Sequence, residues 1–205
     1  MNTNASVRFF DEQFRRQIAA GDLRLNPFEV AALPHLRGRV LDYGCGLGNL
    51  TVAAARQGCA MVAFDASPAA IEHLRAMAQR EDLDIQACEA DLRTYELDDR
   101  FDAIVCIGLL MFFDCSTALR QLSALQQHVR PGGTLVVNVL VEGTTYMNMF
   151  SPQGHCLFGQ EELRDCFRSW ELLDFRRDEF AAPSSTVKVF VTVIARKPAH
   201  DDGDA

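Results

Sequence analysis

The sequence is poor in positive charge. Among its 205 residues, 20 lysines and arginines stand against 28 aspartates and glutamates, which gives a formal net charge of −8 at pH 7. An acidic surface repels phosphate backbones and anionic lipid headgroups. We therefore expect neither nucleic acid nor a membrane as a partner.

Long hydrophobic runs are also missing. The longest strongly apolar, uncharged run covers residues 103–113, whereas a helix that spans a bilayer needs about 20 residues. The N-terminal region carries charges at Arg8, Asp11 and Glu12, and it has no apolar stretch of the kind found in signal peptides. These two absences predict a cytoplasmic protein.

The seven cysteines follow no metal-binding or disulfide spacing. They lie at positions 45, 59, 88, 106, 115, 156 and 166, and no two are separated as in Cys-x-x-Cys. Several fall within apolar runs, where a reduced cysteine packs as a small hydrophobic residue. We expect free thiols, as in a reducing compartment, and no metal site.

The length of the chain predicts a single domain. A chain of 205 residues is long enough to bury one full core. We expect residues 1–197 to form one domain, with residues 1–34 as an N-terminal helical lid. Residues 198–205 hold three aspartates and no large apolar residue, so we expect a disordered acidic tail there.

Short apolar runs alternate with helical patterns along most of the chain. The strand-like runs are apolar at successive positions, as in a sheet covered on both faces, and lie at residues 39–42, 60–64, 83–88, 101–107 and 134–140. The helical patterns lie at residues 50–56, 69–79 and 116–129. This alternation predicts a doubly wound parallel sheet with right-handed crossovers.

Several helix starts are marked by capping residues. Ser67 precedes Pro68, which suits the first position of a helix. Asn26 precedes a proline, and Glu29 is placed to close a capping box with it. Asp114 is of a residue type that favours the cap position before a helix.

The pattern changes after residues 131–133. A helix is expected near residues 160–167, followed by two strand-like runs at 170–176 and 186–196 that are joined by about nine residues. Such a pair predicts an antiparallel hairpin. The expected fold is therefore α/β, a Rossmann-like, doubly wound, mostly parallel seven-stranded sheet with a C-terminal antiparallel hairpin.

A glycine-rich turn follows the first expected strand. Residues 40–49 read Val-Leu-Asp-Tyr-Gly-Cys-Gly-Leu-Gly-Asn. Small residues let a ligand approach the backbone, and the following helix offers free N–H groups. The last glycine of a dinucleotide fingerprint is replaced here by Asn49. Asp42, just before the glycines, suits the amino-acid portion of a cofactor and would repel a pyrophosphate.

Two further acids follow the second and third expected strands. Asp65 lies about 20 residues beyond the glycines, where a carboxylate can accept hydrogen bonds from both ribose hydroxyls; the alternative is that it caps the helix begun at Pro68. Asp91 precedes the apolar Leu92, a pair that suits an adenine ring and its amino group. Together with Asp42, these acids are expected along one edge of the sheet, where open α/β sheets bind their ligands.

This combination resembles the class I S-adenosylmethionine (SAM)-dependent methyltransferases over nearly all of residues 35–197. The resemblance implies SAM as cofactor and S-adenosylhomocysteine as its product. In that family the glycine turn lies under the methionine portion, the second acid holds the ribose and the third meets the adenine. The cofactor-binding residues implied are Asp42, Gly44, Cys45, Gly46, Asp65, Ala66, Asp91, Leu92 and Ile107.

The second half of the chain is similar to the tellurite-resistance, TehB-like methyltransferases. The likeness is carried by residues 110–112 (Leu-Met-Phe), 130–133 (Arg-Pro-Gly-Gly), 162–163 (Glu-Leu), 170–171 (Trp-Glu) and 195–197 (Ala-Arg-Lys). Two segments depart from that family. Residues 178–183 contain no His-Arg pair, and residues 146–149 read Tyr-Met-Asn-Met instead of a Tyr-Pro-Cys stretch.

The resemblance implies methyl transfer to a small-molecule acceptor, such as tellurite or another soft chalcogen nucleophile, by a monomer or homodimer. A soft nucleophile needs little help from a base, and no catalytic residue is evident; His155, in the loop expected over the methyl group, is the one candidate. Arg24 could pair with the cofactor carboxylate or simply be exposed. Aromatic and methionine side chains of the N-terminal helix and two loops are expected to line an apolar lid.

Three alternatives remain open at this point. A SAM-binding paralogue without turnover would carry the same cofactor motifs. An NAD-dependent reductase is disfavoured by Asn49 and by the lack of a Tyr-x-x-x-Lys pair. A metalloid could be gathered by Cys45 and Cys106 together with Cys115 or Cys156, although no closely spaced cysteines support this.

Overall fold

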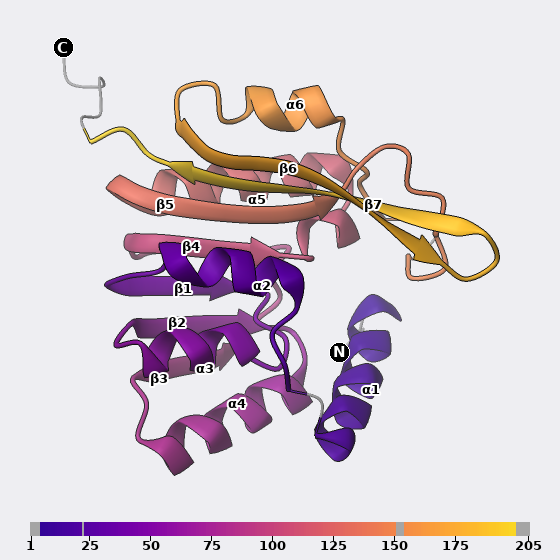
Figure 1. The fold of residues 1–205 in the computed structure, drawn as a ribbon. Helices are drawn as coiled ribbons and strands as arrows, with labels where there is room; N and C mark the ends of the chain where they lie inside the picture. The colour runs from indigo at the N-terminus through magenta and orange to yellow at the C-terminus, as the bar shows by residue number, and fades with distance from the viewer. Residues whose placement is uncertain (1–4, 22, 151–153, 200–205) are drawn as a thin grey trace.

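A computed structural model describes residues 5–21, 23–150 and 154–199. One sheet runs through the molecule in the strand order β3-β2-β1-β4-β5-β7-β6 (Figure 1). Its strands are β1 (Arg39–Tyr43), β2 (Ala60–Asp65), β3 (Ile85–Glu89), β4 (Phe101–Ile107), β5 (Val129–Leu140), β6 (Glu171–Ala182) and β7 (Thr186–Arg196). The helices are α1 (Ala5–Ala20), α2 (Pro27–Ala32), α3 (Asn49–Arg56), α4 (Pro68–Glu81), α5 (Cys115–His128) and α6 (Gln160–Asp165), with 3₁₀ turns at Leu33–His35 and Leu110–Phe112.

The predicted fold class is confirmed. Strands β1 to β5 pair in parallel, whereas β7 pairs antiparallel with both β5 and β6. Helices α2, α3 and α4 cover one face and α5 the other, so successive residues of the inner strands are buried, as Val40 and Leu41 are. This double cover is why those strands are apolar at consecutive positions.

Helix α1 stands apart from the two helical layers. It crosses the carboxyl ends of the parallel strands (Figure 1) and is fastened to the start of α4. The carboxylate of Asp11 accepts hydrogen bonds from the Ser67 hydroxyl at 2.6 Å and from the Ala69 backbone N–H at 3.2 Å. The edge of the sheet where ligands are expected therefore lies beneath α1.

The predicted caps all form. Asn26 and Glu29 make a complete capping box at α2, and the side chain of Ser67 accepts a hydrogen bond from the backbone of α4. Asp114 accepts one from the backbone N–H of Thr117 at 2.9 Å. These local interactions fix where each chain segment enters its helix.

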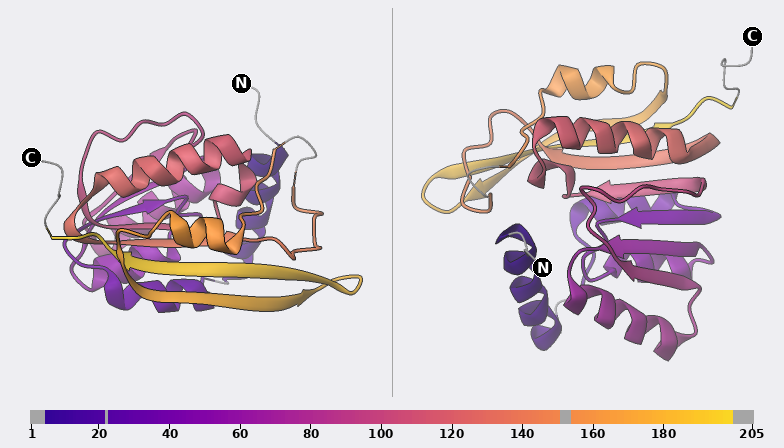
Figure 2. Two further views of the ribbon diagram at one scale, coloured as in Figure 1. Left: turned by 90° about the horizontal axis from the view of Figure 1, so that it is seen from above. Right: turned by 180° about the vertical axis from the view of Figure 1, so that it is seen from behind.

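The C-terminal hairpin differs from the expectation. Strand β6 continues to Ala182, and the connection to β7 is a tight turn at residues 183–185 rather than a loop of about nine residues. Ser184 and Ser185 adopt positive φ angles of 60° and 56°, which lets the chain reverse quickly. Because β6 is an edge strand, it can carry the charges of residues 178–179 that made this segment read as a loop. The hairpin tip extends beyond the rest of the sheet (Figure 2).

The expectation that every cysteine is a free thiol is wrong. Cys115, at the start of α5, and Cys156, in the segment after β5, form a disulfide with a Cα–Cα distance of 4.7 Å. The backbone N–H of Cys156 also donates to the carbonyl of Met111, which brings this segment beside α5. The two cysteines are 41 positions apart in the chain, and nothing in the local sequence indicated the pairing. The other five cysteines are free thiols.

Two further observations concern the described residues. None of their helices is both long and apolar enough to cross a membrane. Pro198 and Ala199 continue from β7, whereas residues 200–205 of the expected acidic tail lie outside the described part of the chain.

Candidate active site

A cavity of about 710 Å³ opens at the carboxyl ends of the strands, beneath α1. Its walls come from α1, α2, the glycine turn and the ends of β2, β4, β5 and β7. The nine residues expected to contact a cofactor all line it: Asp42, Gly44, Cys45, Gly46, Asp65, Ala66, Asp91, Leu92 and Ile107. The topology thus gathers, at one edge, residues from four separate stretches of sequence.

The glycine turn has a backbone that only glycine adopts easily. Gly44, Gly46 and Gly48 have φ angles of 86°, 53° and 74°, in the left-handed region that L-residues with side chains avoid. A Cβ added to Gly46 would also meet the Phe14 ring at 3.2 Å, and one added to Gly48 would meet Leu74 at 2.5 Å. The turn is therefore held close to α1 on one side and to α4 on the other.

Asp65 joins the glycine turn to the start of α4. Its Oδ2 accepts a hydrogen bond from the Gly46 backbone N–H and its Oδ1 accepts one from the Ser67 backbone N–H, both at 2.8 Å. The helix cap is Ser67, which leaves Asp65 at the cavity wall rather than in the cap position. Burial raises the pKa of the Asp65 carboxyl, although the backbone donors oppose this.

Asp42 lies deeper, at the floor of the cavity. Its side chain is 4% exposed, and its Oδ2 accepts a hydrogen bond from the Thr51 hydroxyl at 2.6 Å. Burial, together with the negative charges of Glu29 and Asp65, raises its pKa to about 7, against the effect of the Thr51 hydrogen bond. Burial also raises the pKa of Glu29. Asp42, Glu29 and Asp65, whose pKa values are all raised, share this end of the cavity. A cationic ligand would favour their ionised forms.

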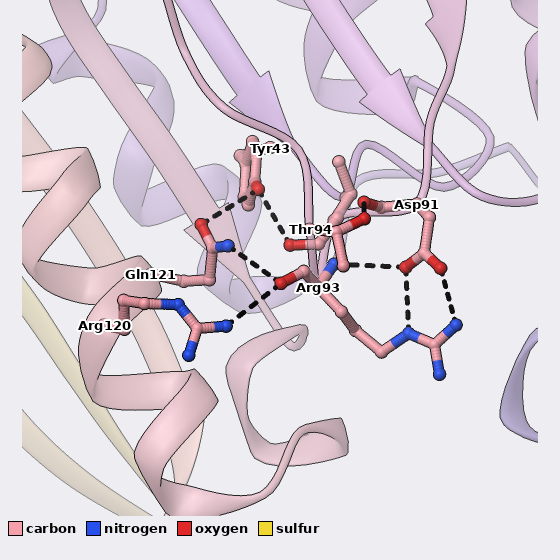
Figure 3. A network of polar contacts seen from close by, with 7 residues as sticks. Tyr43, Asp91, Arg93, Thr94, Arg120 and Gln121 are labelled. Atoms are coloured by element: carbon pink, nitrogen blue, oxygen red, sulfur yellow. Dashed lines mark hydrogen bonds and ion pairs between the residues drawn. The ribbon is translucent and has the colours of Figure 1, made fainter.

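Asp91 has a more open position on a well-anchored turn (Figure 3). Its carboxylate forms an ion pair with Arg93, whose Nε donates at 2.9 Å, and this partner lowers its pKa. The neighbouring carbonyl groups hold the turn: the Tyr43 hydroxyl donates to Leu92 O at 2.9 Å, and the Gln121 side chain donates to Arg93 O at 3.2 Å. These bonds tie the loop after β3 to β1 and α5, which fixes Asp91 at the cavity edge.

The sulfur atoms near the cavity are not arranged to bind a metalloid. Cys106 is fully buried in the core, and Cys115 and Cys156 are joined in the disulfide. Cys45 lines the cavity, but burial raises the pKa of its thiol. Among the described residues, no group of three or more His, Cys, Asp or Glu side chains is placed to hold a metal ion. The described residues therefore do not form the cluster of thiols that metalloid binding would require.

His155 is not among the described residues that line the cavity. Its ring stacks on Phe150, with ring centroids 5.0 Å apart. Phe150 in turn packs against Phe112 at 5.2 Å, and Phe112 against Phe10 of α1 at 5.0 Å. These rings form a continuous aromatic cover that joins α1 to the loops after β4 and β5.

The sequence analysis missed several residues on the far side of the cavity. Phe28 and Glu29 reach it from α2, Asn138 from β5, and Lys188 and Phe190 from β7. Asn138 left a signal in the sequence, because it is a polar residue inside the apolar run of residues 134–140. The positions of Lys188 and Phe190 depend on how β7 pairs with β5, which no local pattern indicates.

Comparison with known proteins agrees with this geometry. Residues 40–133 match a family described as a methyltransferase domain. The chain is 30% identical over 168 residues to hemagglutinin 1 of Eikenella corrodens, covering 78% of this chain and 55% of that protein. It is 24% identical over 166 residues to a probable SAM-dependent methyltransferase, TehB, of Haemophilus influenzae strain 10810, covering 78% and 57%. The chain thus spans little more than half the length of these relatives.

Solved structures share the fold. TehB from Haemophilus influenzae superposes with a TM-score of 0.73 at 20% identity, covering 84% of this chain and 62% of that one. The N-methyltransferase NodS of Bradyrhizobium japonicum WM9, in complex with S-adenosylhomocysteine, does so with a TM-score of 0.69 at 19% identity, covering 92% and 98%. The chain therefore has the fold of these methyltransferases, and its residues 40–133 match a methyltransferase-domain family.

Proposed function

We propose that the protein transfers a methyl group from SAM to a small-molecule acceptor. The observation that carries the proposal is the row of carboxylates Asp91, Asp65 and Asp42, which lie at or just beyond the carboxyl ends of three neighbouring strands and line one cavity. Ligands of open α/β sheets bind at this edge. The methyltransferase match over residues 40–133 supports the same conclusion.

The lining residues fit SAM from one end to the other. Asp65 is placed to accept hydrogen bonds from ribose hydroxyls, and Asp91 with Leu92 to meet the adenine. Asp42 and Glu29, whose raised pKa values favour a cationic neighbour, suit the methionine end. Arg24 lies on the same wall and could meet the carboxylate there. When bound, the cofactor supplies a methyl group already activated on a sulfonium sulfur.

The chain's own contribution to the reaction is alignment and the exclusion of water. Ile107 at the end of β4 and Gly108 just after it line the cavity, as do Phe10 and Phe112, and Phe150 packs against Phe112. Holding two reactants in a near-attack geometry can lower a barrier by roughly 7–11 kcal/mol at best. We assign residues 1–34 the role of a lid within a single domain of residues 1–197.

We further propose that the acceptor is a soft nucleophile such as tellurite or another chalcogen compound. No histidine occurs among the described lining residues, and a soft nucleophile needs little help from a base. The resemblance to TehB-like proteins supports this acceptor. His155 stays a weak candidate for a catalytic role. A cytoplasmic location and a monomeric or homodimeric state complete the proposal.

Thermal unfolding with S-adenosylhomocysteine, and in parallel with NAD, tests the cofactor. A ligand present at about 100 times its Kd adds roughly 2.7 kcal/mol to the free energy of unfolding, which raises the Tm by several degrees. We expect this rise with S-adenosylhomocysteine and none with NAD. A rise with NAD alone would favour a reductase instead.

Transfer of a labelled methyl group from SAM then tests turnover. The acceptor panel should contain tellurite, selenite, a simple thiol, an amine and a phenol. We expect product with at least one of the soft acceptors. Cofactor binding without product from any acceptor would favour a non-catalytic, SAM-binding paralogue. Light scattering on the same preparation distinguishes a monomer from a homodimer.

A further inference from the structure

Asn138 is a buried amide with an unused hydrogen-bond acceptor at the cavity wall. The residue lies on β5, is fully buried and lines the cavity. Its Nδ2 donates to the Thr192 hydroxyl oxygen on β7 at 3.0 Å. Its Oδ1 is the one buried side-chain nitrogen or oxygen without a hydrogen-bond partner in the described part of the chain.

A buried oxygen of this kind destabilises the protein unless something donates to it. Buried polar atoms are nearly always paired, and an orphan carries the full free-energy cost of its lost hydration. An apolar residue at position 138 would avoid that cost and would match the neighbouring Val137 and Val139, which are also fully buried. The orphaned Oδ1 of Asn138 therefore indicates a donor that arrives with a ligand.

The strand order places Asn138 outside the row of cofactor carboxylates. Asp91, Asp65 and Asp42 lie at or just beyond the carboxyl ends of β3, β2 and β1, and β4 separates β1 from β5. Neighbouring strands lie about 4.8 Å apart, so Asn138 is displaced by about 10 Å across the sheet from the strand that carries Asp42. It pairs in register with Ile107, at the end of β4, where the methyl group is expected. This is the side from which an acceptor would approach.

The surroundings of Asn138 define the kind of acceptor. Phe28 of α2 and Phe190 of β7 pack together at 4.9 Å and both line this part of the cavity. Lys188 of β7 also lines the cavity, and its Nζ lies over the Tyr146 ring, 4.7 Å from the centroid. An apolar wall with a single orphaned acceptor suits a molecule that has an apolar or polarisable body and an N–H or O–H group.

We propose that Asn138 is an acceptor-binding residue whose Oδ1 receives a hydrogen bond from an N–H or O–H group of the methyl acceptor. The inference rests on the proposed function and narrows its substrate class: among the proposed soft acceptors, those with an N–H or O–H group, such as a protonated chalcogen oxyanion, qualify, whereas a thioether does not. The bond to Thr192 joins the amide to β7, in the arrangement that leaves Oδ1 without a partner.

Matched probes test this in the protein saturated with S-adenosylhomocysteine. Phenol and anisole have similar shapes, but only phenol has a donor. Their affinities are measured by ligand-observed NMR for the wild type, for Asn138→Leu and for the control Asn148→Leu, which changes an exposed residue outside the described cavity lining. Indole and 1-methylindole repeat the comparison with an N–H donor.

We expect the wild type and the Asn148→Leu variant to prefer phenol over anisole by about tenfold. The Asn138→Leu variant should bind both probes equally while its affinity for S-adenosylhomocysteine stays unchanged. Thr192→Val, which frees the amide to rotate, should lower the preference in part. If the leucine variant does not fold, Asn138→Val, with a shorter side chain that favours strands, replaces it.

Other results would overturn the proposal. The proposal fails if the wild type binds the two probes with equal affinity or binds neither. It also fails if the Asn138→Leu variant still prefers phenol. A drop in affinity for S-adenosylhomocysteine would instead assign Oδ1 to the cofactor. Failure of the wild type to bind S-adenosylhomocysteine at all would contradict the proposed function itself, which keeps the two failures distinct.

Discussion

The two halves of the sheet contribute to the cavity in different ways. In the parallel half, β3, β2, β1 and β4 each end in a short segment whose residues line the wall directly, as the glycine turn and Asp65 do. In the antiparallel half, β5 and β7 contribute side chains from within the strands, such as Asn138 and Lys188. One half therefore lines the cavity with the carboxyl ends of its strands and the turns that follow them, and the other with side chains that the register of its strands places there.

This difference separates the two tasks of the site. Turns that follow parallel strands present backbone N–H groups and carboxylates at one edge, which suits a cofactor of constant shape. Side chains on paired antiparallel strands can change without altering the backbone hydrogen bonds, which suits an acceptor that differs between relatives. We expect changes in the parallel half to affect cofactor affinity and changes in the antiparallel half to leave it intact.

The largest expected effect concerns the disulfide. Replacing Cys115 and Cys156 together by serine opens a loop of 41 residues, and closing a loop of this length contributes about 4 kcal/mol to stability. Urea unfolding should show a loss of this order. Because the disulfide ties the segment after β5 to α5, the affinity of the folded variant for S-adenosylhomocysteine should change little. A matching Cys166→Ser control, which alters a free thiol, should leave both quantities unchanged.

The second prediction addresses the parallel half. Asp65→Ala removes the carboxylate that accepts hydrogen bonds from Gly46 and Ser67 and that we assign to the ribose. We expect the affinity for S-adenosylhomocysteine to fall by about 100-fold, measured by calorimetry. Circular dichroism should remain unchanged. An affinity equal to that of the wild type would rule out the ribose role.

The third prediction uses the raised pKa of Asp42, which is about 7 because of burial and the nearby charges of Glu29 and Asp65. The folded state keeps this proton to a higher pH than the unfolded state does, so Asp42 should lower stability as the pH rises from about 4 to about 7. Binding of a cationic cofactor group favours the ionised form. The affinity for S-adenosylhomocysteine should therefore increase with pH, by at most about tenfold per unit below the pKa.

Asp42→Asn serves as the control for both trends. This variant should bind more weakly and show a flatter pH dependence of both its Tm and its cofactor affinity. If the wild type and the variant share the same pH profile, Asp42 is not the group that titrates.

The smallest expected effect is that of Asp91→Ala. The side chain of Asp91 is 48% exposed and already paired with Arg93, and exposed charge pairs contribute little. We expect the affinity for S-adenosylhomocysteine to fall by about fivefold or less. A loss as large as that of Asp65→Ala would mean that the two acids contribute equally, despite their different burial.

Much of the parallel half could be read from the sequence because its signals are local. The caps at Asn26 and Ser67 act within three residues, and the glycine turn lies within one short segment. Continuous apolar runs predict the strands of this half, as expected when both faces of a sheet are covered. The three cavity acids follow those strands directly, so their meeting at one edge follows from the predicted topology.

The antiparallel half was harder to predict from the sequence because its contacts join residues that lie far apart in the chain. Strand β6 carries charges at Asp178 and Glu179, which an edge strand tolerates but which read as a loop. The bond between Asn138 and Thr192 spans 54 residues, and the disulfide spans 41. Contacts of this range leave no periodic or spacing signal in a single sequence.

By itself, then, the sequence determined the fold class, the cofactor family and the row of acids, because each depends on residues close together in the chain or on strand ends that the topology must bring together. Only the tertiary structure decided which residues of β5 and β7 line the cavity, which cysteines pair, and the burial that raises the pKa of Asp42. Those features depend on the register between distant strands and on exclusion from water, and both arise only when the chain has packed.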